Sequence, residues 1–279
     1  MASEIQTTSG YVTVIGGQLY YEEAGSGPTL AFIPAQVADL HIWDSQVPSF
    51  SQNYRVIRYD LRGHGLSKTQ PITYSPVTDL NDLLCQLNVE KAVLFSLGFS
   101  SSIALDYALA YPDMVKALIL VSPQSAEIEQ PKSEAEKKQL TAIAQAEQAQ
   151  DVERLAELES KLWLAGPEPT QAKAQTEPVQ QDVLREMIVR DYQRRAYGAK
   201  ARPPIPASAE RLSKICVPTL VVVGELDTDG VKSKAHELCH AIPFARQMVF
   251  PNTARAVNVA HPNQFNRVVL DFLAHAPKQ

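Results

Sequence analysis

The chain has 279 residues, of which 20% are charged, and a formal net charge of -5. This length can bury the core of one α/β domain with an insertion. Charges of both signs are scattered along the chain, so neither nucleic acid nor a membrane surface is an expected partner. The N-terminus lacks the pattern of a signal peptide and no apolar run approaches ~18 residues, so we expect a cytoplasmic protein.

The predicted elements begin with strands. Two alternating runs around Gly16-Gly17 predict a hairpin over 11–25, and "TLAFIP" and "YRVIRYD" predict strands on either side of a helical segment near Trp43. Helices and strands then alternate. The predicted ranges are helix 77–87, strand 91–95, helix 101–111, strand 115–121, strand 218–225, helix 232–241, strand 246–251 and helix 263–275. Such alternation predicts an α/β fold, with a mostly parallel central sheet and helices on both faces.

Residues 124–214 interrupt this alternation with a different composition. The segment is rich in Glu, Gln, Lys and Ala, and helical spacing runs through 140–164 and again through 179–197. It turns irregular at "RPPIPAS". Apolar residues at helical intervals argue against a flexible linker, so we interpret 124–214 as an inserted helical cap on a core formed by 1–123 and 215–279. These apolar residues are Leu155, Leu158, Leu162, Trp163, Met187 and Ile188.

The three cysteines, Cys85, Cys216 and Cys239, are odd in number and widely spaced. This pattern indicates neither a disulfide framework nor a zinc site. We expect buried thiols. No phosphate-binding loop or metal cluster is visible, so no cofactor is predicted.

The stretch "VLFSLGFSSSIALDYALAYP" at 93–112 has the pattern of a strand, a sharp turn and a buried helix that ends before Pro112. One large group of enzymes places a serine nucleophile at such a turn, in the pattern Gly-x-Ser-x-Gly. Here the five residues are Ser96-Leu97-Gly98-Phe99-Ser100. The central position of the turn is therefore a glycine.

From Leu19 onward the chain resembles the α/β-hydrolases, in particular bacterial cap-bearing esterases and haloperoxidase-like enzymes. The turn "YDLRGHGLS" resembles the family's Asp-x-Arg-Gly-x-Gly-x-Ser motif, and "KALILVSP" resembles its sixth strand. "LWLAGP" is similar to a cap-helix motif, "VVVGELD" to the strand before the catalytic acid, and "HPNQFNRVVLDFL" to the last helix. The resemblance implies the α/β-hydrolase fold with an inserted cap.

The resemblance also locates the family's catalytic positions. Its serine, acid and histidine correspond to Gly98, Asp227 and Arg255, so the catalytic triad is degenerate. The oxyanion loop, His-Gly-x in the family, is Pro34-Ala35-Gln36 here. The backbone N–H groups of Gln36 and Phe99 could still form an oxyanion hole.

These replacements disfavour ester hydrolysis by the usual route. Gly98 has no side-chain atom to attack with, and an arginine keeps its proton because its pKa stays above about 12. Losing a serine–histidine unit costs about a million-fold in a serine protease. Two rearrangements stay open: a nucleophile relocated to Ser96 or Ser100, and His261 as a substitute base. His41 is a further candidate for the pocket lining.

The resemblance places Arg255 and Asp227 side by side beneath the cap, where we expect a bidentate pair. Gly98 relieves backbone strain and is expected to enlarge the pocket. The candidate catalytic residues are Arg255, Asp227 and Gln36, and the candidate substrate-binding residues are Gly98, Phe99, Pro34, Ala35, Leu97 and Trp163. Trp43 is a further candidate for an apolar lining.

Three functions follow from this site. The first is a non-hydrolytic enzyme of secondary metabolism, such as a cyclase, lyase or isomerase. It would act on a small apolar or carbonyl-bearing molecule and would stabilise negative charge with Arg255, Gln36 or backbone N–H groups. The second is a ligand-binding or signalling protein similar to hydrolase-derived hormone receptors. The third is a residual hydrolase, and a scaffold role is also open. The sequence indicates no oligomeric state.

Overall fold

The structure, a computed structural model, describes residues 6–124, 133–168, 178–196, 198–202 and 208–275. Its main sheet has the strand order β1-β2-β4-β3-β7-β8-β10-β11, with β5 paired to β2. The bounds are β1 Thr7–Val14, β2 Gly17–Ala24, β3 Thr29–Ile33, β4 Arg55–Tyr59, β5 Lys68–Thr69, β7 Ala92–Leu97, β8 Val115–Val121, β10 Thr219–Gly224 and β11 Ala245–Phe250. Strands β3, β4, β7, β8, β10 and β11 pair in parallel, and β1 and β2 are antiparallel.

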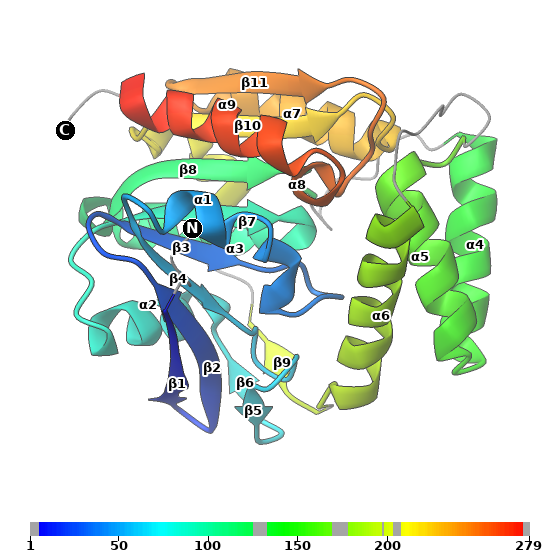
Figure 1. Cartoon of the computed structure of the whole chain (residues 1–279), viewed down its shortest axis with the longest axis horizontal. Helices are drawn as coiled ribbons and strands as arrows, with labels where there is room; N and C mark the ends of the chain where they lie inside the picture. The colour runs from blue at the N-terminus through cyan, green and yellow to red at the C-terminus, as the bar shows by residue number, and fades with distance from the viewer. Residues whose placement is uncertain (1–5, 125–132, 169–177, 197, 203–207, 276–279) are drawn as a thin grey trace.

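Helices cover both faces of this sheet (Figure 1). Apolar side chains of α1 (Val47–Phe50) and α9 (Pro262–His275) belong to one core cluster, and those of α2 (Pro76–Gln86), α3 (Ser101–Ala110) and α7 (Asp229–Ala241) belong to the other. The central strands β3, β7 and β10 are buried along their whole length. This two-sided burial confirms the predicted α/β fold class and explains why those strands read as continuous apolar runs.

The short elements connect this framework. They are η1 Leu40–Trp43, β6 Thr73–Tyr74, η2 Gly98–Ser100, η3 Pro112–Met114, β9 Lys200–Ala201, η4 Ser208–Lys214 and α8 Val257–Ala260. β6 and β9 form a separate two-stranded sheet. Helix α7 begins three residues before the predicted 232, because Thr228 caps it by accepting from the Val231 N–H.

The described part of 124–214 contains the helices α4 (Glu134–Gln148), α5 (Val152–Ala165) and α6 (Pro178–Arg194), which stand together beside the sheet in Figure 1. The predicted continuous helix over 140–164 is wrong at one point: α4 and α5 are separate. Gln150 has a φ of 56°, outside the helical region, and Asp151 then caps α5 through the Arg154 N–H. Most of "RPPIPAS" lies outside the described residues.

Polar contacts join α6 to the core. Asp191 is fully buried and accepts from Arg195 Nη2 at 2.8 Å and from the Gly65 N–H at 3.3 Å, and His64 Nδ1 lies 3.1 Å from its Oδ1. Burial opposes ionisation of Asp191, but His64 and Arg195 outweigh it and lower the pKa of this carboxyl. Arg190 also donates to Asp39 at 2.7 Å. These contacts hold the second half of α6 against the turn after β4 and against Asp39 at the start of η1.

The expectation of buried thiols is wrong. Cys85 and Cys216 are exposed and Cys239 is half-buried, and none of the three is in a disulfide bond. Cys85 lies near the end of α2, on the side of the helix that the core leaves uncovered. Among the described helices, none is both long and apolar enough to cross a bilayer.

Candidate active site

Gly98 occupies the sharp turn between β7 and α3, with a φ of 65°. Glycine adopts this left-handed conformation at little cost, whereas other residues are strained there. A Cβ at this position would lie 3.2 Å from Gln124 Oε1, and the Gln124 N–H donates to the Gly98 carbonyl at 3.2 Å. The Gln124 side chain thus occupies part of the space beside the glycine, and the enlargement of the pocket stays a prediction.

Among the serines around this turn, Ser96, Ser101 and Ser102 have hydrogen-bond partners, whereas the Ser100 Oγ has none among the described residues. Ser96 is fully buried and its Oγ donates to Ser101 Oγ at 3.2 Å, between strand and helix. Ser100 is also fully buried. The exposed Ser102 donates to the Phe99 carbonyl at 2.9 Å. Ser96 and Ser100 thus lie where β7 and α3 pass closely, and solvent does not reach either one.

Asp227 and Arg255 form an ion pair at the carboxyl ends of the strands. Asp227 follows β10 and Arg255 follows β11, and Oδ1 and Nη2 are 3.6 Å apart. Asp227 also accepts from the Thr228 N–H at 2.8 Å. The expected bidentate geometry is wrong, since Asp227 Oδ2 and Arg255 Nε are buried and neither has a hydrogen-bond partner in the described ranges. Burial raises the pKa of Asp227, against the opposing charge of Arg255.

Ser122 was not among the predicted site residues. It follows β8 directly, is fully buried and has a φ of 43°. Its Oγ donates to the Arg255 carbonyl at 3.1 Å and its N–H donates to the Val222 carbonyl at 2.7 Å. The residue therefore fixes the Arg255 loop against the sheet. Its place after a buried strand, at the same edge as Gly98, is the sequence signal that could have identified it.

Helix α5 brings Trp163 to this pair. Arg255 Cζ lies 5.7 Å from the Trp163 ring centroid, and the Ala256 N–H donates to the Trp163 carbonyl at 2.9 Å. A guanidinium at this distance from an indole ring is attracted by the ring's quadrupole. Helix α5 and the loop after β11 are thus joined at Arg255 and Ala256.

Glu159 lies one turn before Trp163 on the buried face of α5, and sequence reasoning missed it. The residue is 9% exposed, and its Oε2 has no hydrogen-bond partner among the residues that the structure describes. Burial raises the pKa of Glu159 to about 7, while the charges of Arg255 and Arg195 oppose the shift. An acidic residue among the apolar positions Leu155, Leu162 and Trp163 was the available signal.

The predicted oxyanion loop and lining residues lie in different surroundings. Pro34 and Ala35 are buried, whereas Gln36 is exposed and its carbonyl accepts from Arg195 Nη2 at 3.2 Å. Phe99 is 40% exposed, and its N–H is in the first turn of η2, where helices leave donors free. Leu97 and Trp43 are fully buried in the core.

The candidate histidines contact other groups. His41 pairs with Asp44 at 3.1 Å, and the His261 ring stacks on Phe250 with centroids 6.5 Å apart. His64 contacts Asp191. Within the described ranges, no group of His, Cys, Asp and Glu side chains is placed to hold a metal ion.

One pocket reaches Asp227 of the ion pair, whereas Arg255 is not among the residues that line it. It has a volume of about 150 Å³ and is lined by Asp227 and Leu226, by Ala165 at the end of α5, by Pro167 after it, and by mostly charged residues around them. These further residues are Ser133, Glu136, Glu168, Glu225, Asp229 and Lys232. The lining is largely polar, unlike the apolar lining that was expected. The volume is also below the ~300–1,000 Å³ of typical ligand sites.

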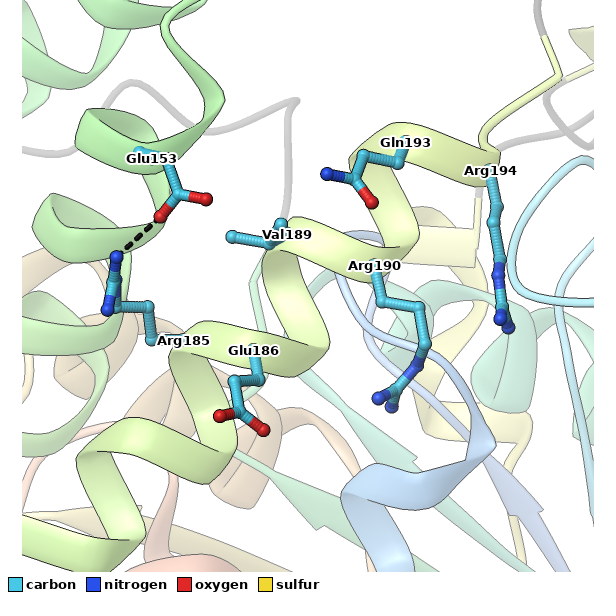
Figure 2. A pocket seen from close by; sticks show the side chains of 7 residues that line it. All are labelled: Glu153, Arg185, Glu186, Val189, Arg190, Gln193 and Arg194. Carbon is cyan, nitrogen blue, oxygen red and sulfur yellow. Dashed lines mark hydrogen bonds and ion pairs between the residues drawn. The ribbon is translucent and has the colours of Figure 1, made fainter.

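A second, larger hollow of about 440 Å³ follows the surface of α6 and is separate from the predicted site residues. Figure 2 shows Arg185 directed toward Glu153 of α5, with Arg190 and Arg194 farther along α6. Glu186, Val189 and Gln193 complete its lining. Because none of the candidate catalytic residues lines this hollow, the Asp227 pocket is the better candidate active site.

Comparisons place this geometry among known proteins. An uncharacterised protein of Mycobacterium tuberculosis is 32% identical over 113 residues, which are 39% of this chain and 33% of that protein. The match thus spans about a third of that relative's length. The pimeloyl-acyl-carrier-protein methyl ester esterase of Yersinia enterocolitica is 22% identical over 259 residues, 91% of this chain and 97% of the esterase.

Solved structures are similar over nearly the whole chain. A hydrolase from Pseudomonas aeruginosa has a TM-score of 0.74 at 28% identity, covering 98% of this chain and 99% of that one. The enol-lactonase from Burkholderia xenovorans has a TM-score of 0.74 at 23% identity, covering 95% and 100%, a likeness in fold alone. The profile of the alpha/beta hydrolase fold matches residues 28–262. With that match over most of its length, the chain belongs to the alpha/beta hydrolase fold family.

Proposed function

We propose that this protein is a non-hydrolytic, cofactor-free enzyme that moves a proton within a small carbonyl-bearing molecule, as isomerases, lyases and cyclases do. The observation that carries the proposal is the turn residue Gly98, which has no atom to attack an acyl group, together with a buried arginine that pairs with Asp227. We infer that the family's serine and histidine have been lost at Gly98 and Arg255. A covalent acyl route then lacks both its nucleophile and its base.

Arg255 supplies the electrostatic part of the reaction in this proposal. Its Nε has no hydrogen-bond partner among the described residues. Asp227 and Trp163 hold the side chain, and Ser122 holds the backbone by donating to the Arg255 carbonyl. A donor held in place in this way can stabilise the oxyanion that forms when a carbonyl compound becomes an enolate. The Phe99 N–H and Gln36 are candidate second donors.

The Asp227 pocket supports a small substrate. Its volume of about 150 Å³ and its charged lining favour a compact ketone or aldehyde over a bulky apolar molecule. The esterase and lactonase named among the relatives act on carbonyl compounds, according to their names. A carbonyl-bearing substrate would therefore resemble the substrates of these relatives in its reactive group.

A residual hydrolase is the second candidate, because the relative covering 91% of this chain is an esterase. It would need a nucleophile in place of Gly98. Ser96 and Ser100 are fully buried between strand and helix, so either serine could attack only after the turn rearranges. We therefore rank this function below proton transfer.

The test uses 3-cyclohexen-1-one, whose double bond moves into conjugation when a proton is transferred, which is followed by ultraviolet absorbance. The purified protein is expected to accelerate this reaction. The double variant Asp227→Asn with Arg255→Met, which leaves no unpaired charge, is expected to lose about 100-fold or more of the rate. Equal rates for wild type, the double variant and buffer would contradict the proposal.

A further inference from the structure

The buried groups at the boundary between cap and core include one carboxyl that the ion pair does not use. Glu159 projects from the buried face of α5, one turn from the Trp163 ring that covers Arg255. Its Oε2 is shielded from solvent and has no donor within the part of the chain that the structure describes. A buried polar atom without a partner costs stability, so such atoms often mark functional sites.

Charged groups from several elements surround this carboxyl. Arg255 lies in the loop after β11, and Arg195 and Asp191 lie on or next to α6, with Glu147 on α4. The arginines favour the carboxylate, whereas Glu147 and Asp191 favour the protonated acid, and Tyr192 of α6 also lies within electrostatic reach. Burial has the largest effect of all and favours the acid. Glu159 is thus balanced between its two protonation states near neutral pH.

Asp60 provides a structural contrast. Burial also raises its pKa, to about 6, but both carboxyl oxygens are occupied. Oδ1 accepts from the Leu40 N–H at 2.8 Å and Oδ2 from the Leu66 N–H at 2.7 Å, so the group holds the turn after β4. Glu159 differs because its Oε2 has no donor among the described residues, one helix turn from the Trp163 ring that covers Arg255.

We propose that Glu159 is the residue that accepts and returns the proton in the candidate active site, an inference that rests on the proposed function. The Glu159 carboxylate takes a proton from the carbon next to the substrate carbonyl, and the electron pair of that C–H bond passes to the carbonyl oxygen beside Arg255. The resulting acid returns the same proton to another carbon as the enolate collapses. No oxidant, reductant or second substrate is needed.

The first test needs no substrate. N,N′-Dicyclohexylcarbodiimide is a small apolar reagent that reacts with protonated carboxyl groups, and the modified residue is found by peptide mass mapping. At about pH 7 we expect an adduct on Glu159, reduced about 10-fold or more at about pH 9. The adduct should vanish in Glu159→Gln and persist in Glu157→Gln, a change at an exposed, ion-paired glutamate on the same helix. Absence of any adduct on Glu159 would overturn the inference.

The second test measures proton transfer to 3-cyclohexen-1-one over a range of pH. We expect the rate of the wild-type protein to depend on a group that titrates near neutral pH. Glu159→Gln should lower this rate about 100-fold or more and remove the pH dependence. Glu157→Gln should keep both the rate and its pH dependence. Circular dichroism of each variant establishes that it is folded. Isomerisation that is equally fast in Glu159→Gln would overturn the inference and leave the proposed function standing. Ester hydrolysis without isomerisation in wild type would instead overturn the proposed function itself.

Discussion

Removing Arg255 should destabilise the fold mainly by leaving Asp227 without its counter-charge. The two side chains are 9% and 1% exposed, and their nearest charged atoms are 3.6 Å apart. Unit charges at about this separation attract by ~4 kcal/mol at an effective dielectric constant of ~20. Breaking a buried pair on one side costs ~3–5 kcal/mol, because the other charge stays buried.

A double-mutant cycle measures the interaction energy between Asp227 and Arg255. We expect Arg255→Met and Asp227→Asn each to lower the free energy of unfolding by ~3–5 kcal/mol, and the double variant to cost less than their sum by ~3 kcal/mol. The assay is urea denaturation at about pH 8, followed by circular dichroism. Single-variant costs that add to within ~0.5 kcal/mol would refute the reasoning, because they would show that the two charges do not interact.

The same cycle has a predictable pH dependence. Burial raises the pKa of Asp227 above its unfolded value, and loss of Arg255 raises it further. A carboxyl with a raised folded pKa lowers stability at high pH, and this penalty disappears as the pH falls through the folded value. The cost of Arg255→Met should therefore be larger at about pH 8 than at about pH 5, whereas the double variant should not show this dependence.

Two further predictions concern the turn and the cap. The double variant Gly98→Ser with Arg255→His should gain hydrolysis of p-nitrophenyl butyrate. The serine is expected to fit at a strain cost of ~1–3 kcal/mol, because its Cβ would meet only the far end of the Gln124 side chain. A folded but inactive variant would count against the predicted degenerate triad. Asp191→Asn should lower the free energy of unfolding by ~3–5 kcal/mol at about pH 7. Because folding lowers the pKa of Asp191, this loss should shrink as the pH falls below about 4. An unchanged urea midpoint at neutral pH would contradict the prediction.

The sheet could be predicted because its strands carry a local signal. Segments 92–97, 115–121 and 219–224 are continuous apolar runs, as two-sided burial requires. The break between α4 and α5 was missed because apolar spacing continues through it, although Asp151 is a good helix-capping residue. The exposed thiol of Cys85 was missed because composition alone does not say which side of a helix faces the core.

The candidate site was less predictable because its contacts join distant segments. The positions of Gly98, Asp227 and Arg255 followed from the resemblance, and the structure brings Asp227 and Arg255 together. The contact of Gln124 with the turn depends on how the loop after β8 returns to β7, and the burial of Glu159 depends on how α5 packs. No pattern in a single segment reports either arrangement.

The most direct test of the non-hydrolytic account is the intact mass of the protein after incubation with a fluorophosphonate, measured together with release of p-nitrophenol from short and medium acyl esters. The variant carrying Gly98→Ser and Arg255→His serves as the positive control. The account predicts no adduct and no turnover for the wild-type protein, because Gly98 offers no nucleophile. A stoichiometric adduct on Ser96 or Ser100 with ester turnover would contradict it.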